Sequence, residues 1–180
     1  PPVGDRSFRA FLDSLPDVLA ARDLRTTADA VVSAAWAKRG VVLLLGGHVI
    51  KVGLGPLVAD WIRRGIVTHI AMNGAAAIHD FELAAFGGTS EDVAAGLGDG
   101  TFGMAEETGR EMNAAISAAA RDHRGMGEGL ALYLSARPER PGDEVSVLLA
   151  CHRQGTPVTV HTAEVDGVRS FYRVGVRRGP

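Results

Sequence analysis

The run VVLLLGG at residues 41–47 decides the fold, because five consecutive apolar residues are followed at once by two glycines. A short, unbroken run of β-branched and aliphatic residues is typical of a strand buried on both faces of a parallel sheet. A second apolar run, at residues 67–72, ends at Asn73-Gly74. The two runs predict two parallel strands, each with turn-forming residues at its carboxyl end.

A helix is predicted between these strands, over residues 53–64. Pro56 lies in its first turn and Gly65 follows its end, which is the usual placement of these residues around a helix. Its apolar residues fall on one face: Leu54, Leu57, Val58, Trp61 and Ile62. A strand, a helix and a second strand of these lengths form a right-handed βαβ unit with a parallel sheet.

The same alternation continues on both sides of this unit. Helices are predicted at residues 27–39, 75–86, 102–120 and 145–153, a second helix or a mobile arm at residues 125–136, and a third strand at residues 157–161. This pattern predicts a layered α/β fold in one domain, residues 1–180, with its core at 27–161. The stretches 158–165 and 168–176 are rich in β-branched and aromatic residues and flank Asp166-Gly167, a strong hairpin signal. Residues 157–176 are therefore expected to form a terminal strand and a β-hairpin.

Composition excludes several classes of partner. The chain has 180 residues and a net charge of −2, from 21 acidic and 19 basic side chains, which gives no broad positive field for nucleic acid or an anionic membrane. No apolar run approaches the ~20 residues that span a bilayer, so a cytoplasmic protein is expected. Cys151 is the single cysteine and the six histidines have no HExxH-type spacing, so no metal site is predicted.

Ligands of open α/β sheets bind beyond the carboxyl ends of the strands, where helix N-termini offer backbone N–H groups. Two segments occupy such places, residues 46–53 and 73–82. The first contains Gly46, Gly47 and Gly53, which permit close approach of a ligand, together with His48 and the positive charge of Lys51. The second contains Asn73, Gly74 and Ala75, followed by the polar residues His79, Asp80 and Glu82.

Structural roles compete with these functional ones. Tight turns after strands need glycines whether or not a ligand is present, and His48 fits a structural role as well as a functional one. His79 and Asp80 suggest a general base and its orienting carboxylate, but sequence neighbours on a helix point in different directions, which argues against direct pairing. Asp80 alternatively interacts with a helix N-terminus.

Several ordered blocks resemble the deoxyhypusine synthase family, and most closely its bacterial deoxyhypusine synthase-like branch. The blocks are GHVIKVGL at 47–54, AMNGA at 71–75, IHDFE at 78–82, TSEDV at 89–93 and FGMAEETG at 102–109. The resemblance extends over roughly residues 8–161 and concerns the N-terminal half of the family's proteins. It implies a truncated, Rossmann-like three-layer parallel sheet, a tetramer with sites between subunits, and NAD bound at the strand ends.

Members of that family oxidise a polyamine such as spermidine with NAD and pass its aminobutyl group, through a lysine imine, to an acceptor amine. By position, Gly47-His48 matches a Ser-Asn pair of the family's cofactor loop, residues 73–75 match a Thr-Ala-Gly loop, and His79-Asp80 matches a Glu-Asp pair. The family's imine-forming lysine belongs to a downstream segment that this chain lacks, and Lys51 aligns with a serine.

These observations lead to one main functional expectation. The chain is expected to be a deoxyhypusine synthase-like enzyme of altered chemistry that binds NAD, acts on a small amine or polyamine-like substrate, and forms a homo-oligomer, either a dimer or a tetramer. The expected catalytic residues are His48, His79, Asp80 and Glu82. The expected cofactor-binding residues are Gly46, Gly47, His48, Lys51, Gly53, Asn73, Gly74 and Ala75.

Two alternatives remain open at this point. The chain is a catalytically inactive, truncated paralogue that serves as an assembly or regulatory subunit, with the hairpin as its assembly element. Otherwise it is a stable fragment of a longer protein.

Overall fold

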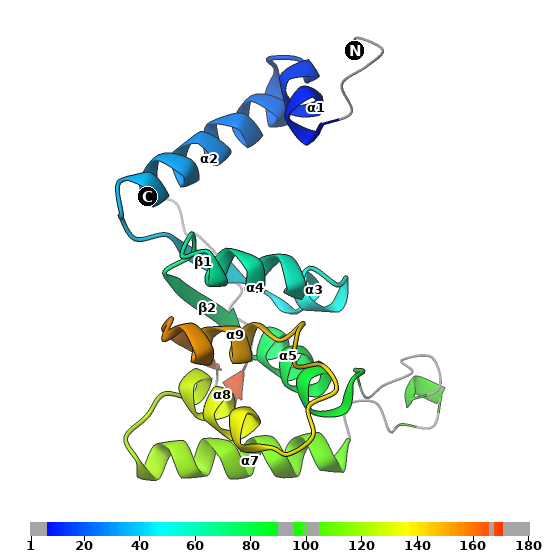
Figure 1. The fold of residues 1–180 in the computed structure, drawn as a ribbon. Coiled ribbons are helices and arrows are strands. Elements are labelled where there is room, and N and C mark those ends of the chain that lie inside the picture. Colours follow the sequence, from blue (N-terminus) through cyan, green and yellow to red (C-terminus); the bar gives the residue numbers. More distant parts are fainter. Residues whose placement is uncertain (1–6, 90–95, 99, 101–104, 166–167, 171–180) are drawn as a thin grey trace. The chain divides into compact units, whose positions relative to one another are not determined.

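A computed structural model describes residues 7–89, 96–98, 100, 105–165 and 168–170, in two compact units, 1–41 and 42–180. The first unit contains α1 (Phe8–Ser14) and α2 (Leu19–Trp36) (Figure 1). The helix predicted at 27–39 therefore begins earlier than expected, because residues 19–25 are mostly good helix formers that extend it backward. Organisation as a single domain stays a prediction.

Three parallel strands form the sheet of the second unit. These are β1 (Val42–Leu45), β2 (His69–Asn73) and β3 (Val158–His161), in the order β1-β2-β3. In this register Leu44 pairs with Ala71, and Ala71 pairs with Thr159. The prediction of an α/β fold with a parallel sheet is confirmed. The expectation that the first strand is buried on both faces is wrong, because Val42 is 56% exposed and Leu44 is 75% exposed on β1.

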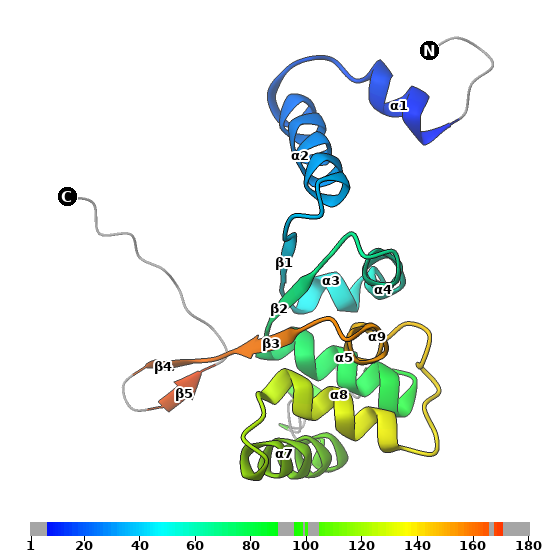
Figure 2. The ribbon, with the colours of Figure 1, turned by 60° about the vertical axis from the view of Figure 1, so that its left-hand side comes forward.

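The helices of the second unit lie on one side of this sheet (Figure 2). They are α3 (Gly47–Lys51), α4 (Gly55–Arg63), α5 (Gly74–Phe86), α7 (Glu106–Arg121), α8 (Met126–Ala136) and α9 (Val147–Gln154). Both crossovers, β1 to β2 and β2 to β3, step across the sheet in the same direction, so right-handed connections put their helices on the same side. Phe81 of α5, Ile62 of α4 and Leu148 of α9 are fully buried between these elements.

Two expectations need correction or fall outside the described residues. The segment 46–53, for which no helix was predicted, contains the short helix α3. Near the C-terminus, β4 (Ala163–Val165) pairs antiparallel with β5 (Val168–Ser170). The turn residues 166–167 and residues 171–176 lie outside the described residues, so the terminal hairpin stays a prediction. Among the described residues, no helix has both the length and the apolar character needed to cross a membrane.

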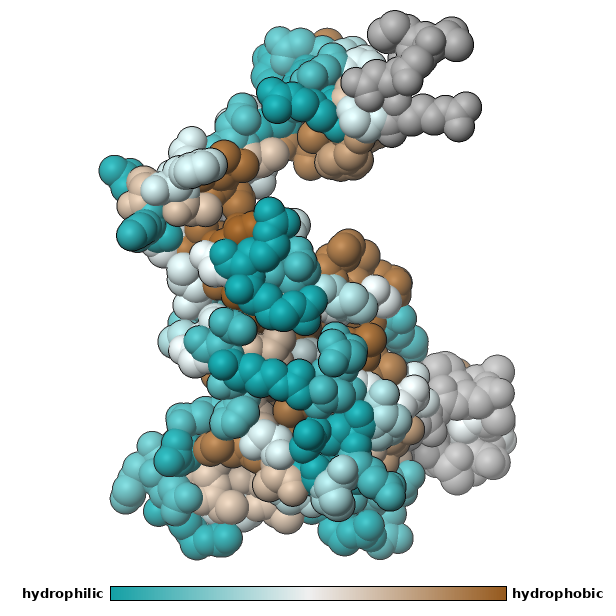
Figure 3. All heavy atoms as spheres, in the orientation of Figure 1, coloured by the Kyte–Doolittle hydropathy of each residue, from teal (hydrophilic) through white to brown (hydrophobic). Residues whose placement is uncertain are grey.

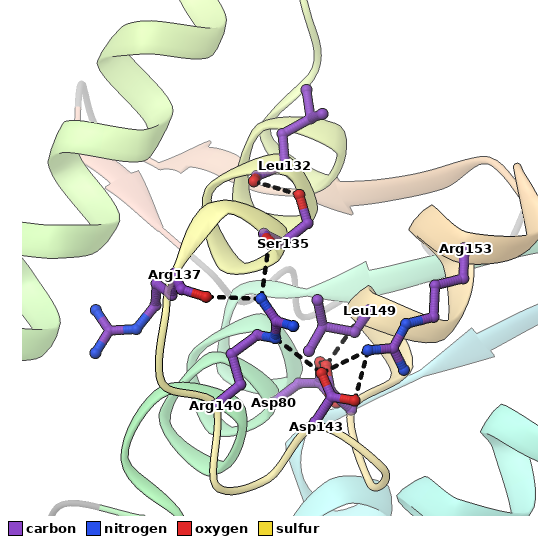
Figure 4. A network of polar contacts seen from close by, with 9 residues as sticks. Asp80, Leu132, Ser135, Arg137, Arg140, Asp143, Leu149 and Arg153 are labelled. Atoms are coloured by element: carbon purple, nitrogen blue, oxygen red, sulfur yellow. Dashed lines mark hydrogen bonds and ion pairs between the residues drawn. The ribbon is translucent and has the colours of Figure 1, made fainter.

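Arginine side chains anchor the loop that joins α8 to α9 (Figure 4). Arg140 donates hydrogen bonds to the backbone oxygens of Ser135 and Arg137, and both Arg140 and Arg153 donate to the carboxylate of Asp143. These contacts, led by the hydrogen bond from Arg153, hold the pKa of Asp143 below its usual value. The loop is thereby fixed just before Ser146, the N-cap of α9.

The buried thiol of Cys151 on α9 gives a direct test of this core. Burial, followed by the nearby charge of Asp80, raises the pKa of Cys151 to about 12. Because the thiolate is the nucleophile, we expect alkylation of the folded chain at pH 8 to be at least about a hundredfold slower than alkylation of the urea-unfolded chain. Intact-mass measurement during iodoacetamide treatment checks this, and equal rates would contradict the buried placement of the thiol.

Candidate functional site

The carboxyl ends of β1 and β2 lie side by side, and the helices that follow them are in close contact. Leu45, the last residue of β1, pairs with Met72 of β2. A Cβ atom placed on Gly46 would lie 3.5 Å from Nδ2 of Asn73, and one placed on Gly47 would lie 3.0 Å from Cβ of Ala75. These glycines therefore allow the start of α3 to approach the start of α5, which is a structural reason for their presence.

Asn73 marks the point where β2 ends and α5 begins. Its side-chain oxygen accepts a hydrogen bond from the backbone N–H of Ala76 at 2.9 Å, as an N-cap residue does. The predicted cofactor-binding residues Asn73, Gly74 and Ala75 thus form the N-terminus of a 13-residue helix. This end of α5 carries small residues and a partial positive charge from the helix dipole.

A polar cluster of three residues lies next to this point and joins α5 to α7. On α5, Nδ1 of His79 lies 3.7 Å from Oε2 of Glu82. The other carboxylate oxygen of Glu82, Oε1, accepts a hydrogen bond of 3.0 Å from the hydroxyl of Thr108 on α7. Glu82 and Thr108 are buried, whereas the side chain of His79 keeps 24% of its surface exposed. We call these three residues the His79 cluster.

The imidazole of His79 also contacts the first strand end. A Cβ atom on Gly47 would lie 3.2 Å from Cδ2 of His79. In the imidazole ring Cδ2 and Nδ1 lie on opposite edges, so one edge of the ring faces Glu82 and the other faces the start of α3. The structure therefore brings together four of the predicted residues at the strand ends, Gly46, Gly47, Asn73 and His79, with Glu82 behind them.

Asp80, expected to be catalytic, has a different position. Its Oδ1 accepts a hydrogen bond from the N–H of Val147 at 2.8 Å, and its Oδ2 accepts from the N–H of Leu148 at 2.9 Å and from the hydroxyl of Ser146 at 2.8 Å. The residue has no exposed surface. Burial raises the pKa of Asp80, and the three hydrogen bonds oppose that shift. Asp80 therefore caps the N-terminus of α9 from a neighbouring helix, a structural role close to the alternative left open above.

The remaining predicted residues lie on or after α3. His48 and Lys51 are exposed on this helix. Gly53, just after it, has a φ of +85°, a backbone conformation that favours glycine, and a Cβ atom there would meet nothing within 4 Å. Local backbone conformation accounts for Gly53 without a ligand. Within the part of the chain that the structure describes, no group of three or more His, Cys, Asp or Glu side chains is arranged to hold a metal ion.

Sequence reasoning missed two residues that the structure places at important positions. Ser146 is the N-cap of α9, and a serine directly before an apolar run is a signal that could have found it. Thr108 has no such signal, because its partner Glu82 is 26 residues away on another helix. Only the packing of α7 on α5 brings the two together.

Comparisons with known proteins overturn the family resemblance. No protein-family model matches the chain, and no curated protein matches it. Among solved structures, the chain is similar to a conserved protein of Methanococcus maripaludis S2 described as LOR/SDH, with 16% identity and a TM-score of 0.45. That match covers 87% of this chain and 40% of the other, so the chain spans about two fifths of that protein's length.

The identification with the deoxyhypusine synthase family is therefore wrong. The resemblance rested on short ordered blocks, and residues in two of them have structural explanations: Gly47 lies at a helix contact and Asp80 caps a helix. The prediction of NAD as the cofactor is therefore no longer supported by a family resemblance. The same holds for a polyamine substrate and a tetramer.

The cap formed by Asp80 gives a testable stability difference. Replacing Asp80 with Ala leaves three buried donors without an acceptor, and we expect a loss of about 3–4 kcal/mol in the free energy of unfolding. Asp80→Asn keeps one acceptor oxygen and is expected to cost about half as much. Urea denaturation followed by circular dichroism measures both.

Asp60→Ala serves as the matched control. Asp60 forms only an exposed ion pair with Arg64, so its loss is expected to change stability by less than about 1 kcal/mol. If Asp80→Ala were no more destabilising than this control, the capping role of Asp80 would be refuted.

Proposed function

We propose that the chain is an enzyme that binds a small, phosphate-bearing ligand of the nucleotide class where β1 and β2 end, and that His79 moves a proton to or from that ligand. The observation that carries the proposal is the position of the imidazole. It lies against Gly47 at the start of α3 and has the carboxylate of Glu82 3.7 Å behind its Nδ1. A histidine oriented by a carboxylate is a common arrangement for general acid–base catalysis.

The surrounding backbone suits an anionic group. Gly46 and Gly47 follow β1, and Gly74 and Ala75 follow β2, so the residues that follow both strands have no bulky side chains of their own. The first N–H groups of a helix have no acceptor within the helix, and phosphates bind readily at such positions. Asn73 takes the N–H of Ala76, which leaves the N–H groups of Gly74 and Ala75 as the candidate donors. Lys51 is exposed on α3 and stays a predicted contact for the phosphate.

Several finer expectations stay predictions within this proposal. They are NAD as the particular nucleotide, an amine as the substrate, assembly into a homo-oligomer, a cytoplasmic location, and a truncated Rossmann-like sheet with a C-terminal hairpin. A parallel sheet whose glycines follow β1 is compatible with a dinucleotide. The amine has less support, because both oxygens of Glu82 already have partners in the His79 cluster.

Calorimetric titration of the full chain tests the proposal, with inorganic pyrophosphate and NAD as separate probes. We expect saturable binding of at least one probe and at least about tenfold weaker binding by Gly47→Val, because the added side chain displaces Ala75 and His79 from the strand ends. Addition of spermidine to the same titration tests the expected amine substrate.

Gly109→Ala is the matched control for this titration. A Cβ atom at Gly109, on α7, meets nothing within 4 Å, so this variant is expected to bind each probe as the parent does. Binding of neither probe to the parent chain would overturn the proposal, as would equal binding by the parent and Gly47→Val.

A second candidate function, assembly with another copy of the chain, is favoured by an apolar surface over α3 and α4. Figure 3 shows apolar residues gathered over this segment, where Val52 is 65% exposed and Leu57 is 60% exposed, with Leu54 and Trp61 also exposed. Exposed apolar patches of this kind often mark interfaces between proteins.

The mass of the chain in solution tests this second candidate. We expect light scattering after size exclusion to give a dimer or larger assembly for the parent chain, and a smaller mass for Leu57→Glu, because a charge in the interface must be desolvated. Arg63→Glu, a change on the same helix outside the apolar patch, is the control. A monomeric parent chain would remove this candidate.

A further inference from the structure

We infer that Thr108 and Glu82 position His79 with its proton on Nδ1, so that Nε2 is the nitrogen that accepts a proton from the ligand. The inference deepens the proposed function and rests on it for the identity of the reaction. It assigns roles within the His79 cluster: Thr108 and Glu82 are positioning residues, and His79 is the general base.

Thr108 fixes the orientation of the Glu82 carboxylate. An ionised carboxylate only accepts hydrogen bonds, so the single hydroxyl proton of Thr108 must be donated to Oε1 of Glu82, at 3.0 Å. Both side chains are buried, and burial of a carboxylate is costly unless it receives hydrogen bonds. With Oε1 held by Thr108, the other oxygen, Oε2, faces His79.

The position of Oε2 determines which imidazole nitrogen carries the proton. Nδ1 of His79 is buried, has no hydrogen-bond partner among the residues that the structure describes, and lies 3.7 Å from Oε2 of Glu82. A bare lone pair on Nδ1 would face a negatively charged oxygen, whereas an N–H there would face an acceptor. The tautomer with its proton on Nδ1 is therefore favoured, and Nε2 then carries the lone pair.

The lone pair on Nε2 then lies toward the ring edge that faces the start of α3, the side on which the proposed ligand binds. Nε2 is bonded to Cδ2, the atom that faces Gly47 at the start of α3. The preferred ligand is therefore a phosphate-bearing molecule with a hydroxyl group near its phosphate. The O–H bond breaks, its electron pair stays on the oxygen, and the proton forms a new bond to Nε2. The resulting imidazolium carries its positive charge next to Glu82, which stabilises it.

The tautomer can be measured without any ligand. In the full chain labelled with ¹⁵N-histidine, long-range ¹H–¹⁵N correlation spectra distinguish a protonated ring nitrogen from a bare one, and the His79→Gln variant identifies the signal of His79. At a pH where the ring is neutral, we expect the proton on Nδ1. We expect Thr108→Val to lower the ratio of this tautomer to the other roughly fivefold, the amount that corresponds to one net hydrogen bond.

Two further variants separate positioning from mere packing. Thr108→Ser keeps the hydroxyl and is expected to keep the proton on Nδ1 of His79. Glu82→Gln removes the negative charge and is expected to abolish this preference for Nδ1. Thr27→Val, which changes an exposed threonine of α2, is the control. The serine variant keeps the test decisive even if Thr108→Val folds poorly, because serine preserves the donor that the inference requires.

The outcomes separate this inference from the proposed function. A proton on Nε2 in the parent chain, or a tautomer unchanged in both Thr108→Val and Glu82→Gln, would overturn the inference even if pyrophosphate or NAD binds. Conversely, a proton on Nδ1 that depends on Thr108 and Glu82 would support the positioning roles, while failure of both probes to bind would count against the proposed function alone.

Discussion

The second unit depends on one buried carboxylate. Asp80 of α5 accepts hydrogen bonds from two backbone N–H groups and the capping hydroxyl at the start of α9. These are donors that a helix leaves unsatisfied at its first turn, and the positive end of the helix dipole offsets part of the cost of burying a carboxylate there. The contact joins segments 66 to 68 residues apart in the sequence and fixes α5 against α9.

Helical geometry divides the polar residues of α5 between structure and function. Successive residues of a helix point about 100° apart, whereas residues three apart lie on the same face. Asp80 therefore faces the interior and α9. His79 and Glu82, three positions apart, share a face that contacts the start of α3 and, through Thr108, also α7. One stretch of four residues, 79–82, thus supplies both the main structural cap and the candidate catalytic group.

The sequence was informative about elements and less so about the contacts between them. Apolar runs located all three strands of the parallel sheet, and periodicity with glycine and proline signals located α4, α5, α8 and α9, because these signals are local. The start of α2 was misplaced, since helix propensity continues smoothly through residues 19–25 without a clear cap. The short helix α3 was missed because five residues carry too little periodicity to be distinguished from a loop.

In the candidate site, too, the sequence predicted where residues lie along the chain but not which residues contact one another. The order of residues in the sequence placed His79, Asn73 and the glycines just after two predicted strands. The carboxyl ends of neighbouring parallel strands meet at one edge of a sheet, so these residues were expected to lie close together. The sequence could not assign Asp80 to α9 or Thr108 to Glu82, since each partner lies on a helix whose packing no local pattern specifies. The family resemblance failed for a related reason. Short blocks of glycine and acidic residues arise wherever helices pack closely and need caps, so such blocks report shared local constraints as readily as shared ancestry.

The same contacts imply that the site and the fold form together. The orientation of His79 requires Glu82 from its own helix, Thr108 from α7 and the close approach of α3 at Gly47. An isolated α5 lacks the contacts with Thr108 and Gly47, and the cap at Asp80 holds α5 in place only when α9 is also folded. A ligand that binds at the strand ends therefore binds the assembled set of helices and not the unfolded chain, and its binding free energy adds to the stability of all of them. The polar groups that prepare the site for chemistry are in this way also part of the core that keeps the helices together.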